Sequence, residues 1–201
     1  LNAMADLEKT GKNLEGRGFR VHRFASGAEA AEFLVQTLHG TSIGIGGSVT
    51  IDTLGVYDRL CGSNEVFWHW KNHAPETRER AGKAETYLCS ANGVSENGEI
   101  VNIDGKCNRV AATLFGPKRC IFVCGVNKLR PDLQSAIERA RNIAAPLNAK
   151  RLNKKTPCAV DGRCHNCKSP ERICRAMVIH MGVPSGFESC EVVLIGEKLG
   201  Y

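Results

Sequence analysis

The alternation of short apolar segments with helix-forming segments constrains the fold of this chain most. The strand candidates are apolar and bounded by turn residues, and the helix candidates repeat apolar residues at helical spacing. The strand candidates are residues 19–24, 42–45, 65–70, 86–90 and 119–124. The helix candidates include residues 5–14, 75–84, 131–144 and the segment from Ser48 to Leu60. This order predicts an α/β fold, with a mainly parallel open sheet and helices on both faces.

Three local patterns refine this prediction. Ser26 and Glu29 form a capping box, which predicts a further helix start. Pro146 is expected to end or kink the helix that precedes it, because proline lacks a backbone donor. Residues 176–181 and 190–195 are two late strand candidates around a Pro/Gly turn, and we expect them to form a β-hairpin.

Length and composition indicate an ordinary globular protein. The 201 residues are enough for a sizeable core, and we predict a single domain over residues 4–201. No apolar run approaches the roughly 20 residues that span a bilayer, and the sequence lacks the pattern of a secretory signal. We therefore expect a cytoplasmic protein that does not interact with membranes.

The positive charge is concentrated in one segment. The formal net charge is +6, and residues 151–175 hold seven Lys or Arg against two Asp or Glu. The rest of the chain is nearly neutral, so the basicity belongs to a local site. This distribution argues against a general nucleic-acid-binding face.

A glycine-rich turn follows the strand candidate at residues 42–45. Gly46 and Gly47 let the backbone approach a ligand closely, and Ser48 and Thr50 add hydroxyl donors. Free N–H groups at such a strand-to-helix turn favour a phosphate or carboxylate. The pattern is neither a Walker loop nor a dinucleotide fingerprint. A tight turn that merely needs small residues is an equal alternative.

A polar segment in the middle of the chain supplies further candidates. Arg109, with Lys128 after a later strand, is suited to gripping an anion, while Asn102, Asp104 and Asn108 fix its orientation. Asp104 and Lys128 are the candidate catalytic residues. The alternative is that Asp104 and Arg109 form an ion pair that only holds a loop.

Four cysteines near the C-terminus form the strongest local pattern. Cys158, Cys164, Cys167 and Cys174 have the spacing C-x5-C-x2-C-x6-C, and a C-x2-C pair presents two thiolates to one metal. In a cytoplasmic protein, metal ligation is a better explanation than disulfides. We predict a cysteine-rich metal-binding insertion at residues 156–175 that holds an iron–sulfur cluster, with zinc as the alternative. The alternative is four free thiols in a flexible loop or two adventitious disulfides.

Several motifs together resemble the lactate-utilisation (LUD) domain family. They are Gly44–Thr50, Glu99–Gly105, Asn108–Ala111, Phe115–Lys118, Asn127–Lys128, Ala144–Arg151 and the ending Gly196–Tyr201. The resemblance implies a fold like that of ribose-5-phosphate isomerase and the CoA transferases, in which the first glycine-rich turn binds phosphate. It also implies a link to iron–sulfur-dependent oxidation of L-lactate to pyruvate, as a subunit of a larger complex.

The sequence departs from these relatives in two ways. The acidic pair of ribose-5-phosphate isomerases is not evident, since only Asp104 is a candidate, and the ferredoxin-like cysteine runs are absent. Our first hypothesis is an accessory redox protein with a small carboxylate or phosphate ligand and redox partner subunits. A stand-alone enzyme for a sugar phosphate or acyl-CoA is the second, and a ligand-sensing regulator the third. A homo-oligomer is left open.

Overall fold

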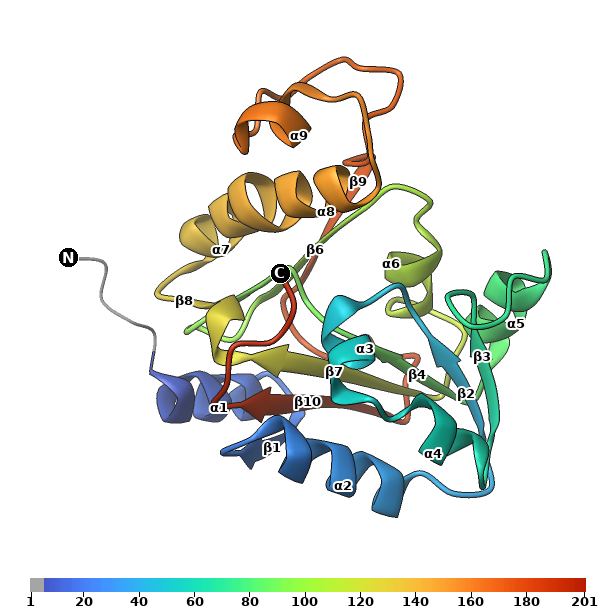
Figure 1. Cartoon of the computed structure of the whole chain (residues 1–201). Helices are drawn as coiled ribbons and strands as arrows, with labels where there is room; N and C mark the ends of the chain where they lie inside the picture. Colours follow the sequence, from blue (N-terminus) through green and yellow to red (C-terminus); the bar gives the residue numbers. More distant parts are fainter. Residues whose placement is uncertain (1–5) are drawn as a thin grey trace.

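The computed structural model describes residues 6–201, and its centre is a parallel six-stranded sheet (Figure 1). The strand order is β1-β10-β7-β4-β2-β3, and every neighbouring pair is parallel. The strands are β1 (Arg20–Phe24), β10 (Ser189–Ile195), β7 (Arg119–Gly125), β4 (Thr86–Cys89), β2 (Ser42–Ile45) and β3 (Glu65–Trp68). The predicted mainly parallel α/β fold is confirmed. Residue 4, where the predicted domain begins, and residue 5, where the first predicted helix begins, lie outside the described residues.

Helices cover both faces of this sheet because alternate strand residues point to opposite sides. In β7, Ile121 and Val123 face the first core cluster, whereas Cys120, Phe122 and Cys124 face the second. The first cluster is closed by α2 (Gly27–Thr37), α3 (Val49–Leu54) and α4 (Tyr57–Cys61). The second is closed by α1 (Leu7–Gly16), α5 (Thr77–Lys83), α6 (Asn108–Ala112) and a smaller sheet.

The smaller sheet has four strands and was not predicted. Its order is β8 (Leu129–Arg130), β5 (Gly93–Ser95), β6 (Ile100–Asp104), β9 (Ala176–His180). One face packs on the large sheet through Val94 and Ile100, and the other packs under α7 (Leu133–Arg139) through Val101 and Ala136. Strands β8 and β5 have only two and three residues, which is too few for an alternating pattern in the sequence.

The expected hairpin of the two late strands is wrong. β9 pairs antiparallel with β6 in the small sheet, whereas β10 lies between β1 and β7 in the large one. The physical reason is burial. From Cys190 to Ile195 every residue of β10 is buried, as a central parallel strand requires.

Two predicted helix boundaries also differ. The helix expected to run through Leu60 breaks at Gly55, which adopts the left-handed conformation with φ of 65°. Pro146 does not end its helix, because a π-helical turn at Ala140–Ala144 shifts the hydrogen bonding and α8 (Ala145–Arg151) follows directly. The capping box at Ser26 and Glu29 is confirmed.

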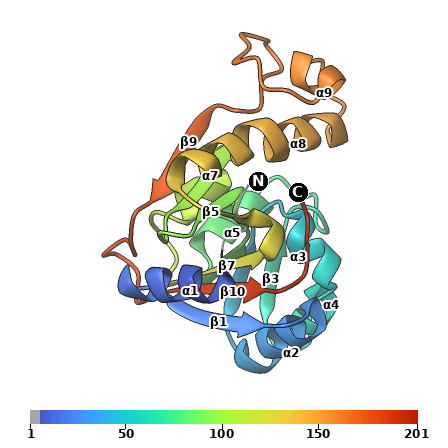
Figure 2. The ribbon, with the colours of Figure 1, turned by 90° about the vertical axis from the view of Figure 1, so that its left-hand side faces the viewer.

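The cysteine-rich segment follows α8. It begins with α9 (Pro157–Asp161), which lies beyond α8 at the edge of the molecule (Figures 1 and 2). The segment then returns to β9, so it joins the outer helices to the small sheet. Among residues 6–201, no helix combines the length and the apolar character needed to cross a bilayer.

The fit of α5 on the large sheet depends on Gly44. A Cβ at Gly44 would overlap the carbonyl oxygen of Ala81 in α5, whereas a Cβ at Gly82 would meet nothing. We predict that Gly44→Ala lowers the free energy of unfolding by about 1–3 kcal/mol, the usual cost of overpacking. Gly82→Ala should leave it unchanged or raise it by up to about 1 kcal/mol. Urea denaturation measures both, and equal midpoints for the two variants would contradict this packing.

Candidate functional site

A pocket of about 960 Å³ lies at the carboxyl ends of four parallel strands. The loop after each strand contributes to it: Gly47 and Ser48 after β2, His69–Lys71 after β3, Ser90–Asn92 after β4, and Lys128 after β7. Open parallel sheets bind their ligands at this edge. The segment from Ile103 to Lys106, Asn108 and Arg109, α8 and the cysteine-rich segment complete the wall.

The lining is strongly basic, and we call it the cationic pocket. Nine Lys or Arg residues line it against three Asp or Glu. Asp52 pairs with Lys71 at 3.2 Å, and Asp104 lies 3.9 Å from Arg109, so two of the acids are already paired. The basic lining residues are Lys71, Arg78, Lys106, Arg109, Lys128, Arg151, Lys154, Arg172 and Arg175. This excess of positive charge favours an anionic ligand.

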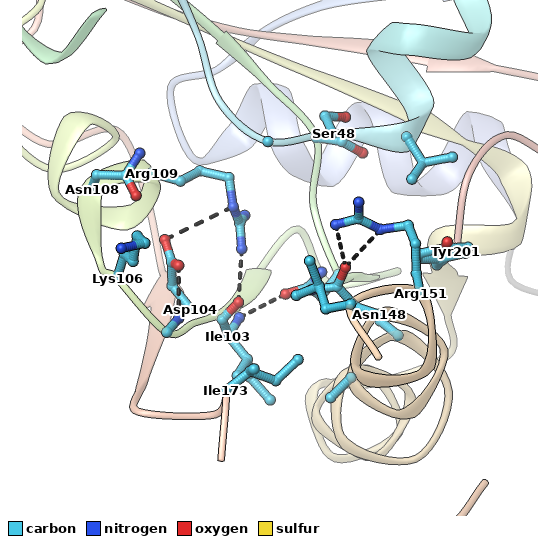
Figure 3. Close-up of a pocket in the computed structure, with 18 of the residues that line it drawn as sticks. Ser48, Ile103, Asp104, Lys106, Asn108, Arg109, Asn148, Arg151, Ile173 and Tyr201 are labelled. Atoms are coloured by element: carbon cyan, nitrogen blue, oxygen red, sulfur yellow. Dashed lines mark hydrogen bonds and ion pairs between the residues drawn. The ribbon is translucent and has the colours of Figure 1, made fainter. Parts of the chain in front are cut away.

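Arg109 is held in place by the small sheet (Figure 3). Its guanidinium donates to the side-chain oxygen of Asn102 and, at 2.7 Å, to the carbonyl oxygen of Ile103. Asn102 is fully buried and also accepts from the backbone N–H of Asn92. Asn102 therefore orients Arg109 and the loop after β4, and it is not among the lining residues.

Asp104 holds the loop before α6. Its carboxylate accepts hydrogen bonds from the backbone N–H groups of Gly105 and Val110, at 2.7 and 3.2 Å. Asn108, the first residue of α6, lines the pocket beside Arg109 (Figure 3). These contacts give Asp104 a structural part at the rim of the pocket.

The glycine-rich turn approaches other pocket residues closely. A Cβ at Gly46 would lie 3.0 Å from the side chains of Arg109 and Tyr87, and one at Gly47 would lie 3.3 Å from Trp70 Nε1. The hydroxyl of Ser48 caps α3 by accepting from the N–H of Ile51. Thr50 donates to the carbonyl oxygen of Leu199, so its hydroxyl ties the C-terminal segment to the turn.

Lys128 is the most buried cation of the pocket. Its side chain is 3% exposed, and no residue among 6–201 accepts a hydrogen bond from it or forms an ion pair with it. Burial, with the positive charges of Arg139 and Arg109, lowers the pKa of the Lys128 ammonium to about 7. A large fraction of Lys128 is therefore a neutral amine near pH 7.

Sequence reasoning missed the contribution of α8 and of the loop after β3. Asn148 accepts from Arg151 at 2.8 Å, and the guanidinium of Arg151 lies 4.8 Å from the ring centroid of Trp70. Burial lowers the pKa of His69 to about 4, so this pocket residue is neutral at pH 7. The sequence marks Ala144–Arg151 only as part of the family resemblance, and only the fold brings α8 and the loop after β3 together.

The four cysteines of the predicted metal site line one small cavity. Its volume is about 20 Å³, and Cys158, Cys164, Cys167 and Cys174 all border it. All four are free thiols. Burial raises the pKa of the Cys174 thiol, and Cys164 adds to this effect. We call this space the cysteine cavity.

A basic side chain organises the loop that carries two of these thiols. Arg172 donates to the carbonyl oxygens of Cys167 and Cys174, at 2.6 and 2.8 Å. Cys174, Ile173 and Arg172 border both the cysteine cavity and the cationic pocket. Within the part of the chain that the structure describes, no three His, Cys, Asp or Glu side chains are arranged so that they hold a metal ion.

The lowered pKa of Lys128 has a consequence for stability. Between about pH 7 and the usual lysine pKa of 10.5, the unfolded chain binds a proton that the folded chain does not. The free energy of unfolding should therefore rise with pH in this window, by up to about 1.4 kcal/mol per pH unit. We predict that Lys128→Met removes this rise and that Lys83→Met, at an exposed position, retains it. Urea denaturation at pH 7, 8 and 9 measures the free energy of unfolding of each protein. Parallel pH dependences of the wild type and Lys128→Met would contradict the lowered pKa of Lys128.

Comparison with known proteins assigns the chain to a family. No curated protein matches it significantly. Its structure is similar to that of a DUF162 family protein from Deinococcus radiodurans, with 16% identity, a TM-score of 0.57, and coverage of 94% of this chain and 96% of the other. A second similarity, to eIF2B beta from Chaetomium thermophilum, has 18% identity, a TM-score of 0.33, and coverage of 64% and 44%, which is too low to bear on the fold. The LUD domain model matches residues 7–195. This chain therefore belongs to the LUD domain family of lactate-utilisation-related proteins.

Proposed function

We propose that this protein binds a small carboxylate or phosphate anion in the cationic pocket and serves lactate utilisation as an accessory redox protein. The observation that carries the proposal is the surplus of Lys and Arg at the carboxyl ends of the parallel strands. A guanidinium that the protein already holds in place loses little freedom when it meets a carboxylate or phosphate. Arg109 meets this condition through Asn102 and Ile103.

Binding of simple anions tests this proposal. Arg109→Lys keeps the charge but lacks the planar fork of donors. Loss of one charge-assisted hydrogen bond costs about 1.5–3 kcal/mol, so affinity should fall roughly ten- to 100-fold. Isothermal titration calorimetry with lactate, pyruvate and inorganic phosphate measures the affinity.

The matched control is Arg59→Lys. Arg59 is exposed on α4, pairs with Glu32 at 2.6 Å and does not line the pocket. The affinity of the Arg59→Lys variant for these anions should equal that of the wild type. Absence of binding by the wild-type protein at low salt, or equal affinities of all three proteins, would overturn the proposed anion site.

For the redox part of the function, we propose a metal centre formed by Cys158, Cys164, Cys167 and Cys174. Four thiols around one cavity are a donor set suited to zinc or iron. The cavity between the thiols has a volume of about 20 Å³, and binding of a metal requires the thiols to rearrange around it. An iron–sulfur cluster would supply electron transfer, and zinc would supply a structural cross-link.

Anaerobic purification with metal and sulfide analysis tests the metal centre. We expect bound metal in the wild type, a loss of at least half of it in Cys167→Ser, and unchanged content in Cys61→Ser, whose thiol is exposed and remote from the cavity. Iron with equimolar sulfide supports the electron-transfer role. One equivalent of zinc limits the centre to a structural role. A metal-free wild-type protein would refute the proposed metal centre.

A stand-alone enzyme for a sugar phosphate or acyl-CoA is the second candidate. The size of the pocket favours it, since about 960 Å³ far exceeds the volume of a three-carbon acid. A thermal-shift screen separates the candidates, because a ligand that binds only the folded state raises the melting temperature. Stabilisation by phosphorylated sugars or CoA esters, without an effect of lactate or pyruvate, would favour the enzyme.

A further inference from the structure

Lys128 differs chemically from the other lysines of the cationic pocket. Lys71 and Lys106 are exposed and Lys154 is half-buried, whereas Lys128 is 3% exposed yet lines the cavity. No residue among 6–201 supplies an acceptor for its nitrogen. A buried amine without an anionic partner favours its neutral form, in which the nitrogen has a free electron pair.

The charged groups around Lys128 reinforce this state. Arg109 and Arg139 are the nearby cations, and the buried thiol of Cys124 is the third titratable neighbour. The hydrogen bonds of both guanidiniums go to neutral acceptors, although Arg109 also has the carboxylate of Asp104 at 3.9 Å. Arg109 donates to Asn102 and Ile103, and Arg139 donates to the carbonyl oxygens of Asn92 and Asn127. The positive charges of Arg139 and Arg109 both oppose a third positive charge on Lys128.

A free hydroxyl lies on the neighbouring loop. Ser90 follows β4, lines the same pocket and is 8% exposed, and its oxygen has no partner among residues 6–201. Arg139 holds the two loops together, because it bonds to Asn92 on the loop of Ser90 and to Asn127 beside Lys128. The fold thus holds together two loops that present an unpaired amine and an unpaired hydroxyl to one pocket.

We propose that Lys128 forms an imine with a small anionic ligand that carries an aldehyde or ketone, a 2-oxo acid or a sugar phosphate. The inference rests on the proposed anion binding, which brings the carbonyl group into the pocket. The electron pair of Lys128 Nζ adds to the carbonyl carbon, and Ser90 stabilises the resulting oxygen by a hydrogen bond. The carbon–oxygen bond then breaks, and the oxygen leaves as water with the two protons of the amine. No oxidant or reductant is needed.

Reductive trapping tests the proposal. Protein is incubated with sodium cyanoborohydride and pyruvate, dihydroxyacetone phosphate or lactate in separate arms, and adducts are measured by intact mass and peptide mapping. We expect one adduct, on Lys128, with pyruvate or with the phosphate ester, and none with lactate, which has no carbonyl group to condense. The arm that reacts identifies the ligand class. Labelling should increase as pH rises through about 7.

Variants locate the reaction. Lys128→Met and Lys128→Arg should lose the adduct, and Lys83→Met, which alters an exposed lysine outside the pocket, should retain it. If Lys128→Met does not fold, mapping of the wild-type adduct still decides. Adducts spread over surface lysines without preference for Lys128 would overturn the proposal.

Calorimetry on the same samples separates this inference from the proposed function. Binding of pyruvate and lactate without any adduct would overturn the imine and leave the anion site intact. Absence of both binding and adduct would overturn the two together.

Discussion

Parallel pairing of β2, β3, β4 and β7 is the constraint on which the site depends. Their register places Ile45 level with Trp68 and Leu88, and Cys89 level with Phe122, so these strands end at one edge. Both faces of the sheet are largely apolar and covered, and a buried polar side chain along the strands, such as Glu191 of β10, pairs with a neighbour, here Arg119 of β7. The loops at the carboxyl edge therefore carry most of the polar groups, and together these loops line the cationic pocket.

Two guanidiniums connect this edge to the small sheet and to α7. Arg109 reaches from α6 to Asn102 and Ile103, and Arg139 reaches from α7 to the loops after β4 and β7. Burying such groups is costly unless their donors find acceptors, and here backbone carbonyls and one amide supply them. Neutral acceptors satisfy the hydrogen bonds of Arg139 without compensating its charge, whereas Asp104, at 3.9 Å, compensates part of the charge of Arg109. The same arrangement thus holds the loops in place, makes the pocket positive and keeps the amine of Lys128 without a counter-ion.

The cysteine-rich segment is part of the pocket as well as a candidate centre of its own. Arg172 fixes the loop of Cys167 and Cys174, and Arg175 donates to the carbonyl oxygen of Pro170 at 3.0 Å. Because Ile173 and Cys174 border both cavities, any movement that draws the thiols together also shifts one wall of the cationic pocket. The two cavities therefore share part of their wall.

The sequence alone determined the parallel sheet, its covering helices, the glycine-rich turn and the clustering of four cysteines, because these depend on local periodicity and spacing. It did not reveal the small sheet, the continuation of α8 past Pro146 or the central position of β10, since these depend on which buried surfaces meet. The candidate residues Gly47, Ser48, Thr50, Asp104, Asn108, Arg109 and Lys128 all line the pocket, and Gly46 and Asn102 support it from behind. Only the tertiary structure showed that Asn102 supports the pocket from behind, whereas Lys128 is buried in its wall without a hydrogen-bond partner among residues 6–201. Hydrogen-bond partners and burial arise from residues far apart in the chain, and residue type and spacing do not encode them.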